Sequence, residues 1–128
     1  MTDRRIISTP NAPGAIGPYN QAVVAGGFVH CSGQIALDPK SGEMIGDEIV
    51  CQAEQVFRNL GAVLEAAGSS FERAIKCNVW VADMDDFAAL NEVYARYFPA
   101  ETAPARATVA VRTLPKNALV EIDCLALV

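Results

Sequence analysis

Hydrophobic and polar residues alternate most regularly near the C-terminal end of the chain. The runs Arg106–Arg112 and Leu119–Leu127 have the period of two that is typical of β-strands, and Leu114–Asn117 between them predicts a turn. We expect the two strands to pair through this turn. One face of the sheet would then carry four polar side chains among aliphatic ones: Arg106, Thr108, Glu121 and Asp123. This mixture predicts a face covered by another protein chain, with a small polar site inside it.

The N-terminal part of the chain predicts a loop and a hairpin. Thr9–Tyr19 contains three prolines and two glycines, which exclude a helix there. Gln21–Ala25 and Phe28–Ser32 alternate as strands on either side of Gly26-Gly27, a strong hairpin signal. The sequence Ser32-Gly33-Gln34 then breaks the alternation. We therefore expect a bulge there, or the close approach of a ligand to the backbone.

Two longer segments have the apolar period of a helix. Asp47–Ala67 carries a continuous apolar stripe, with Asp47 as the predicted N-cap and Gly68 as the stop. Met84–Phe98 carries a second stripe, with Asp83 as its predicted N-cap. Because apolar stripes of this width pack against a core, both helices should cover a sheet.

The complete pattern predicts an α+β fold in one domain, residues 1–128, with both helices on one face of a mixed sheet. Arg4–Ser8 adds a short edge strand, and Ala74–Ala82 adds a strand that turns Ile75, Cys77, Val79 and Val81 to the helices. A monomer would leave Trp80 and several valine and leucine side chains of the opposite face exposed to water, so we expect an oligomer.

Composition narrows the possible partners. The net charge of −5 and the lack of a basic run argue against nucleic acid as a ligand. We expect no signal peptide, because the first ten residues lack the apolar h-region of one. We expect no membrane span, because no apolar run approaches about 20 residues. The four cysteines lack C-x-x-C spacing, which indicates free thiols in the cytoplasm.

Few kinds of chemistry fit the remaining polar residues. The single histidine and the cysteine spacing supply no recognisable metal-ligand cluster, and no glycine-rich loop is placed to hold phosphate. His30 and Ser32 lie two apart on one strand face, without the turn that a nucleophilic serine requires. Arg106 and Glu121 leave two interpretations open. They could form a structural ion pair, or Arg106 could bind a small carboxylate while Glu121 orients water.

Five motifs resemble one known family. They run in the family's order and at family-like spacing along nearly the whole chain: Gly17-Pro18-Tyr19-Asn20-Gln21-Ala22, Ser32-Gly33-Gln34-Ile35, Asn91-Glu92-Val93-Tyr94, Pro104-Ala105-Arg106, and Leu114-Pro115-Lys116 followed by Val120-Glu121-Ile122. The family is that of the RidA (YjgF) reactive-intermediate deaminases. The resemblance implies a chorismate-mutase-like fold and a homotrimer with active sites between subunits. It also implies hydrolysis of enamine and imine intermediates, such as 2-aminoacrylate, to 2-oxo acids and ammonia without a cofactor.

The resemblance also implies roles for individual residues. Arg106 matches the family's carboxylate-binding arginine, Glu121 its water-positioning glutamate, and Tyr19 its loop tyrosine. Ser32-Gly33 matches a substrate-binding pair. On its own, Asn91 lies on a helix stripe where a core asparagine satisfied by backbone is the commoner case, but it also matches a pocket position of the family.

One residue departs from the family pattern. Thr108 stands where several members have a cysteine, two residues after the arginine. A contact from the backbone N–H of Thr108 to substrate would survive this change, whereas any thiol chemistry would not.

Other functions would use the same surface. A non-catalytic carboxylate sensor or a chaperone-like trimer would occupy the same cleft, and a specialised relative such as a 2-aminomuconate deaminase would share the motifs. A ribonuclease activity, which is associated with the family, fits poorly with the negative net charge and the single histidine.

Overall fold

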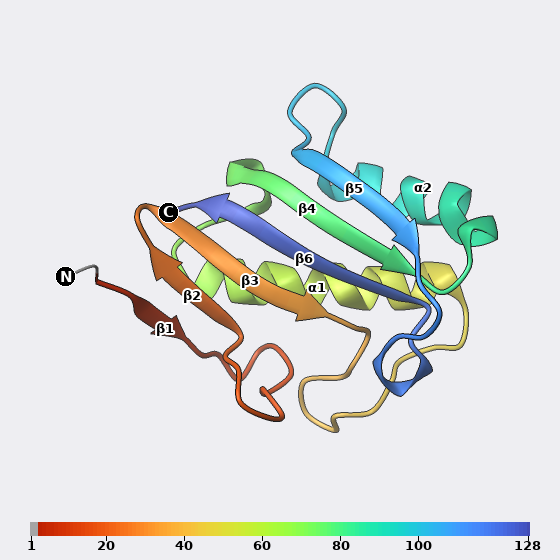
Figure 1. The fold of residues 1–128 in the computed structure, drawn as a ribbon, viewed down its shortest axis with the longest axis horizontal. Coiled ribbons are helices and arrows are strands. Elements are labelled where there is room, and N and C mark those ends of the chain that lie inside the picture. The colour runs from red at the N-terminus through yellow and green to blue at the C-terminus, as the bar shows by residue number, and fades with distance from the viewer. Residues whose placement is uncertain (1–2) are drawn as a thin grey trace.

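The computed structural model describes residues 3–128 as one six-stranded sheet with two helices packed on one face (Figure 1). The strands are β1 (Arg5–Ile7), β2 (Ala22–Ala25), β3 (Phe28–Gln34), β4 (Ala74–Val81), β5 (Ala105–Ala110) and β6 (Val120–Leu127); the helices are α1 (Ile49–Ala66) and α2 (Phe87–Tyr97). Short 3-10 turns span Phe71–Arg73, Met84–Asp86 and Pro115–Asn117. The strand order is β1-β2-β3-β6-β4-β5. The predicted α+β architecture, with both helices on one face, is confirmed.

The core lies between the sheet and the helices. Alternate residues of β6 are buried at 0–2% exposure: Val120, Ile122, Cys124 and Ala126. From α1, Phe57 enters an aromatic cluster in which its ring stacks on Tyr97 at 4.5 Å and meets Phe98 edge-on at 5.9 Å. This cluster joins the two helices to each other.

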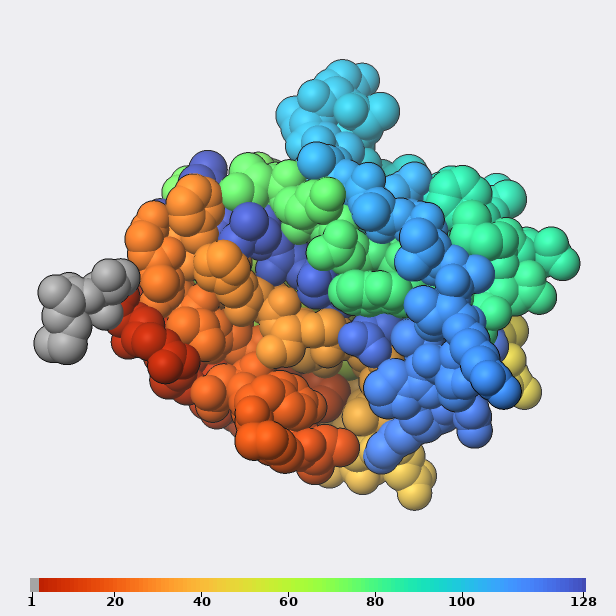
Figure 2. Space-filling model, viewed as in Figure 1, coloured from red at the N-terminus to blue at the C-terminus, as the bar shows by residue number. Residues whose placement is uncertain are grey.

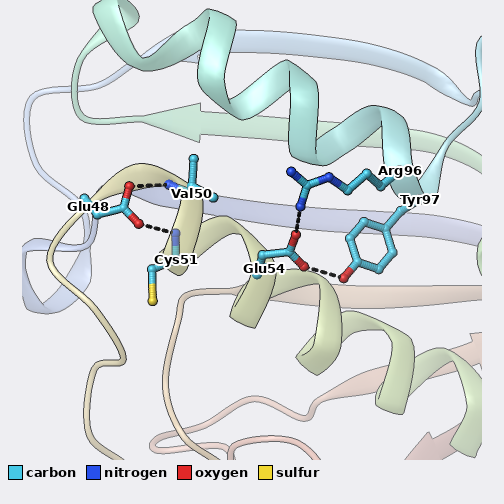
Figure 3. Close-up of polar contacts among 6 residues, drawn as sticks. All are labelled: Glu48, Val50, Cys51, Glu54, Arg96 and Tyr97. Atoms are coloured by element: carbon cyan, nitrogen blue, oxygen red, sulfur yellow. Dashed lines mark hydrogen bonds and ion pairs between the residues drawn. The ribbon is translucent and has the colours of Figure 1, made fainter.

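A polar contact on the outer surface also joins the helices (Figure 3). Glu54 of α1 forms an ion pair with Arg96 of α2, and the Tyr97 hydroxyl donates to Glu54 Oε2 at 2.7 Å. Burial raises the pKa of Tyr97, and the hydrogen bond to Glu54 adds to this effect. The phenol therefore stays a donor to the carboxylate.

The helix termini differ by small amounts from the predictions. Glu48, not Asp47, caps α1, because its carboxylate accepts from the N–H groups of Val50 and Cys51 (Figure 3). Asp83 caps the 3-10 turn that precedes α2 rather than α2 itself. Gly68 follows α1 at φ 81°, as expected for a glycine stop.

The N-terminal hairpin is as predicted. Gly26 and Gly27 both have positive φ, at 60° and 85°, and they join β2 to β3 in an antiparallel pair. The register between β3 and β6 shifts between Cys31 and Gln34, so the predicted irregularity at Gly33 is confirmed.

The predicted pairing of the last two strands is wrong. β4 lies between β5 and β6: it pairs in parallel with β5 and antiparallel with β6. The physical reason is the crossover through α2, which returns the chain parallel to β4 and docks β5 on its outer edge. The inner edge of β4 is left for β6, whose alternate residues are all buried.

Ile75 is a second correction. The alternation predicts Ile75 on the helix side of β4, but Ile75 is 37% exposed, and the buried residue at this end of the strand is Ala74. The register of β4 with β6 shifts between Ala74 and Lys76, which reverses the alternation for one residue.

The unbonded state of the cysteines agrees with the prediction from their spacing. All four are free thiols, and Cys31, Cys77 and Cys124 are buried. Across residues 3–128, no helix has the length and apolar character needed to cross a membrane.

Candidate functional site

A cleft of about 490 Å³ opens where the N-terminal loop meets the ends of β3 and β6. Its lining includes Tyr19, Ser32, Gly33 and Glu121, together with aliphatic side chains from Ile16, Ile35 and Leu37. In Figure 2 the loop around residues 10–20 (red-orange) and the segment around residue 115 (blue) flank this end of the sheet. The cleft therefore collects four of the predicted site residues from three separate parts of the chain.

Glu121 supplies the carboxylate of the cleft. It is half-buried on the sheet face that the helices leave open, and its register partner on β4 is Trp80. Burial raises the pKa of Glu121, and the negative charge of Asp123 on the same strand face raises it further. One interpretation of the sequence is an ion pair between Glu121 and Arg106 of the same chain, which would keep this carboxylate ionised. The structure contradicts that interpretation, because Arg106 lies on the other side of the sheet.

Gly33 lies directly against Glu121. A Cβ atom at position 33 would come within 2.9 Å of Glu121 Cδ, closer than real Cβ contacts come. The φ of Gly33 is not positive, so the glycine is required by space and not by backbone strain. The bulge in β3 thus lets the carboxylate of Glu121 lie over bare backbone.

Ser32 and Gln21 hold the loop that forms one wall of the cleft. The Ser32 hydroxyl donates to the Asn20 carbonyl at 2.6 Å. The side-chain amide of Gln21, 5% exposed, donates to the carbonyls of Thr9, Ala12 and Pro13. The sequence reasoning did not identify Gln21 as a site residue, although it lies inside the first motif. A buried amide with three carbonyl partners fixes a loop that has almost no backbone pairing of its own.

Tyr19 lies at the exposed edge of the same wall. Its side chain is 48% exposed, and its hydroxyl accepts a long hydrogen bond of 3.4 Å from the N–H of Ile16. The tyrosine therefore forms part of the solvent-facing lining of the cleft.

Lys116 lines the cleft from the opposite side, and the sequence reasoning did not identify it as a site residue. It has φ 54°, and Asn117 after it has φ 55°, both in the left-handed region that non-glycine residues seldom adopt. Its place in the Leu114-Pro115-Lys116 motif was the one signal in the sequence that could have identified Lys116 as a site residue.

Arg106 belongs to a second group of residues, between β5 and α2. Its Nη1 donates to Asn91 Oδ1 at 2.7 Å. Its guanidinium carbon lies 5.4 Å from the ring centre of Phe87 and 4.7 Å from that of Tyr94. Asn91 is thus a partner of Arg106 and not a core asparagine satisfied by backbone. Phe87 and Tyr94 are contacts that the sequence reasoning did not assign to the site.

Thr108 lies two residues further along β5, on the same side as Arg106. In the parallel pair of β4 with β5, Arg106 stands beside Cys77 and Thr108 beside Val79, and both β4 residues are buried under the helices. The Oγ1 atom of Thr108 is buried and has no hydrogen-bond partner among the described residues. The prediction that Arg106 and Thr108 share a face with Glu121 is therefore wrong.

The two groups cannot act on one small ligand within a single chain. Two inter-strand steps separate β5 from β6, about 10 Å at the usual strand spacing, and the side chains point to opposite faces of the sheet. A ligand that contacts both Arg106 and Glu121 would have to lie between two copies of the chain.

Comparisons with known proteins agree with the motifs. A family model described as Endoribonuclease L-PSP matches residues 9–128. The chain is 52% identical over 123 residues to the RutC family protein slr0709 of Synechocystis, covering 95% of each protein. It is 44% identical over 124 residues to the human 2-iminobutanoate/2-iminopropanoate deaminase, covering 97% of this chain and 90% of the human protein. Its fold is similar to the crystal structure of RidA from the Antarctic bacterium Psychrobacter, with a TM-score of 0.92, 44% identity and coverage of 97% and 99%.

Proposed function

We propose that this chain, which belongs to the RidA (YjgF) family of reactive-intermediate deaminases, hydrolyses small 2-imino acids to 2-oxo acids and ammonia. The substrates would be 2-iminopropanoate and 2-iminobutanoate, which form when enamines such as 2-aminoacrylate tautomerise. The observation that carries the proposal is the presence of two incomplete sites on opposite faces of one sheet. One holds a half-buried carboxylate over bare backbone, and the other holds an arginine with free N–H groups.

The proposed chemistry needs only these groups. Arg106 binds the substrate carboxylate through two parallel N–H donors, and backbone N–H groups at Gly33 and Thr108 complete its orientation. Glu121 accepts a proton from water, and the water oxygen forms a bond to the imine carbon. As this bond forms, the C=N double bond becomes a single bond and the nitrogen takes up the proton held by Glu121. The new hydroxyl group then becomes the carbonyl of the 2-oxo acid, its proton passes to the nitrogen, and the remaining C–N bond breaks to release ammonia. Tyr19 closes the cleft over the reacting nitrogen. No redox step occurs, so no oxidant or cofactor is required.

The proposal places the reaction between copies of the chain in a homotrimer. On the open sheet face, Trp80 is only half-buried and Leu127 is 40% exposed, beside the polar residues Asn78 and Asp123. A monomer would leave this apolar surface in water. Light scattering with in-line chromatography should give about three times the chain mass of 13.6 kDa. A stable monomer would contradict the shared site.

The free thiols fit a reducing compartment, and we propose that the protein acts in the cytoplasm.

Ammonia release from freshly generated 2-aminoacrylate tests the activity directly. The enzyme should release ammonia faster than spontaneous hydrolysis, in proportion to its concentration. A carboxylate sensor or a chaperone-like binder would bind pyruvate without accelerating the release. The description of the matching family model also names an endoribonuclease, and the net charge of −5 disfavours that activity.

A further inference from the structure

We infer that Phe87 and Tyr94 are positioning residues that hold the Arg106 guanidinium ready for a substrate carboxylate. This inference rests on the proposed function, because it assumes that Arg106 receives the carboxylate. The distances are those of a cation between two aromatic rings: 5.4 Å to the Phe87 ring centre and 4.7 Å to that of Tyr94.

The spacing along α2 creates this arrangement. Phe87, Asn91 and Tyr94 stand at positions i, i+4 and i+7, which lie on one face of a helix. The helix therefore presents a ring, an amide and a second ring in a row to the neighbouring strand. Arg106 of β5 lies along this row and donates to the amide of Asn91.

An arginine on an edge strand needs such support. Arg106 is exposed, and a free arginine side chain samples many rotamers that must be given up when a ligand binds. A carboxylate partner from the protein would restrict the side chain, but it would also neutralise the charge and compete with the substrate. Across residues 3–128, the only ion pair is the one between Glu54 and Arg96, so the Arg106 charge is not neutralised.

Aromatic rings hold the guanidinium without using its hydrogen-bond donors. The rings attract the flat face of the cation, whereas its N–H groups point outward in the plane. Asn91 accepts a hydrogen bond from one of these N–H groups, and among the described residues the guanidinium of Arg106 makes no other hydrogen bond. The planar fork that binds carboxylates therefore stays available.

The ring of Tyr94, and not its hydroxyl, does the positioning. The ring is fixed from behind by Phe57 at 5.8 Å and Phe98 at 4.9 Å. The hydroxyl is buried without a hydrogen-bond partner among the described residues. Burial raises the pKa of Tyr94, the nearby Cys77 thiol adds to this, and Arg106 opposes it. The phenol therefore stays neutral and does not compete with the substrate for Arg106.

Three variants test the inference. Tyr94→Leu removes the ring beside Arg106, Tyr94→Phe keeps it, and Tyr97→Leu removes a ring three residues away that packs on Phe57 without contacting Arg106. For 2-iminopropanoate generated by an amino acid oxidase, we expect Tyr94→Leu to raise KM about fivefold with kcat changed less than twofold. Tyr94→Phe, which keeps the ring, should have the same KM as the wild type. Tyr97→Leu should lower the thermal midpoint and leave KM unchanged.

Equal changes of KM in Tyr94→Leu and Tyr97→Leu would overturn the inference, because both would then act through the core. If Tyr94→Leu does not fold, Phe87→Leu at the half-buried start of α2 serves in its place, with the same expected rise in KM.

Calorimetric binding of pyruvate separates this inference from the proposed function. A wild-type protein that binds pyruvate but hydrolyses no imine would refute the proposed deaminase activity. The dissociation constants of the variants for pyruvate would still test whether Phe87 and Tyr94 position Arg106. We would then expect Tyr94→Leu to weaken pyruvate binding about fivefold. A wild-type protein that binds no 2-oxo acid would overturn both.

Discussion

The carboxyl group of Glu121 occupies the space that a side chain on Gly33 would need. A Cβ at position 33 would come within 2.9 Å of Glu121 Cδ and 3.1 Å of Glu121 Cγ. Because these two residues come from neighbouring strands, the conformation of one strand sets the position of the proposed base on the other.

Gly33→Ala should therefore displace Glu121. A displaced Glu121 no longer acts as general base, so imine hydrolysis should slow about tenfold or more. Gly14→Ala is the matched control. Gly14 lines the same cleft, has no positive φ, and would place its Cβ in open space. Steady-state assays on the two variants should differ in kcat, while light scattering gives the same mass for both. Equal activity of the two variants would show that Glu121 can move without loss.

Much of the cleft could be predicted from the sequence. The alternation along β6 correctly placed Glu121 on the face opposite the core, and the interruption at Gly33 correctly marked the bulge beside it. Both signals are local, because a period of two within one strand decides which residues share a face. The loop that carries Tyr19 was also recognisable from its prolines and glycines.

The face of Arg106 could not be predicted in the same way. Both sides of β5 are exposed along most of its length, so its pattern contains no contrast between a core face and an open face. Its neighbour in the sheet is set by the crossover through α2, which is a property of the whole fold. Local alternation therefore identified Arg106 as a site residue on a strand, but not the side of the sheet to which it points.

Replacement of Arg106 tests the carboxylate contact. Arg106→Ala should weaken pyruvate binding by roughly 2–3 kcal/mol, on the order of a hundredfold, because a charge-assisted pair of hydrogen bonds is lost. Arg106→Lys keeps the charge but loses the planar fork, so a smaller loss is expected. Calorimetric titration measures both, and chromatography should show that each variant assembles normally. Unchanged affinity in both variants would remove Arg106 from the site.

Replacement of Glu121 tests the chemical step. Glu121→Gln preserves the shape of the side chain and removes its basicity, and general-base catalysis is typically worth about 10²–10⁴-fold. We expect this variant to bind pyruvate almost normally and to hydrolyse 2-iminopropanoate at least tenfold more slowly than the wild type. The imine is generated by an amino acid oxidase, and its disappearance is followed. Near-wild-type hydrolysis would mean that Glu121 has a structural role and that water attacks almost unaided.

The pH dependence of the reaction should reflect the charge of Asp123. The active form of Glu121 is the carboxylate, and burial together with Asp123 raises its pKa, so activity should fall on the acidic side as Glu121 is protonated. Asp123→Asn removes the like charge, which lowers the pKa of Glu121 and moves this acidic limb to lower pH. Glu72→Gln, which removes a charge away from the cleft, is the control and should leave the limb in place. A limb that does not move in Asp123→Asn would exclude Glu121 as the titrating base.

Mixing two inactive variants gives the sharpest test of a site shared between copies. Arg106→Ala keeps an intact Glu121, and Glu121→Gln keeps an intact Arg106, so a mixed trimer contains some interfaces at which both native groups meet. Random assembly of equal amounts should restore about a quarter of the wild-type sites. Mixing Arg106→Ala with Arg106→Lys is the control. Both variants lack the native arginine of the shared site, so no native site can form. If both groups acted within one chain, neither mixture would recover activity. The placement of Arg106 and Glu121 on opposite faces of the sheet predicts recovery in the first mixture alone.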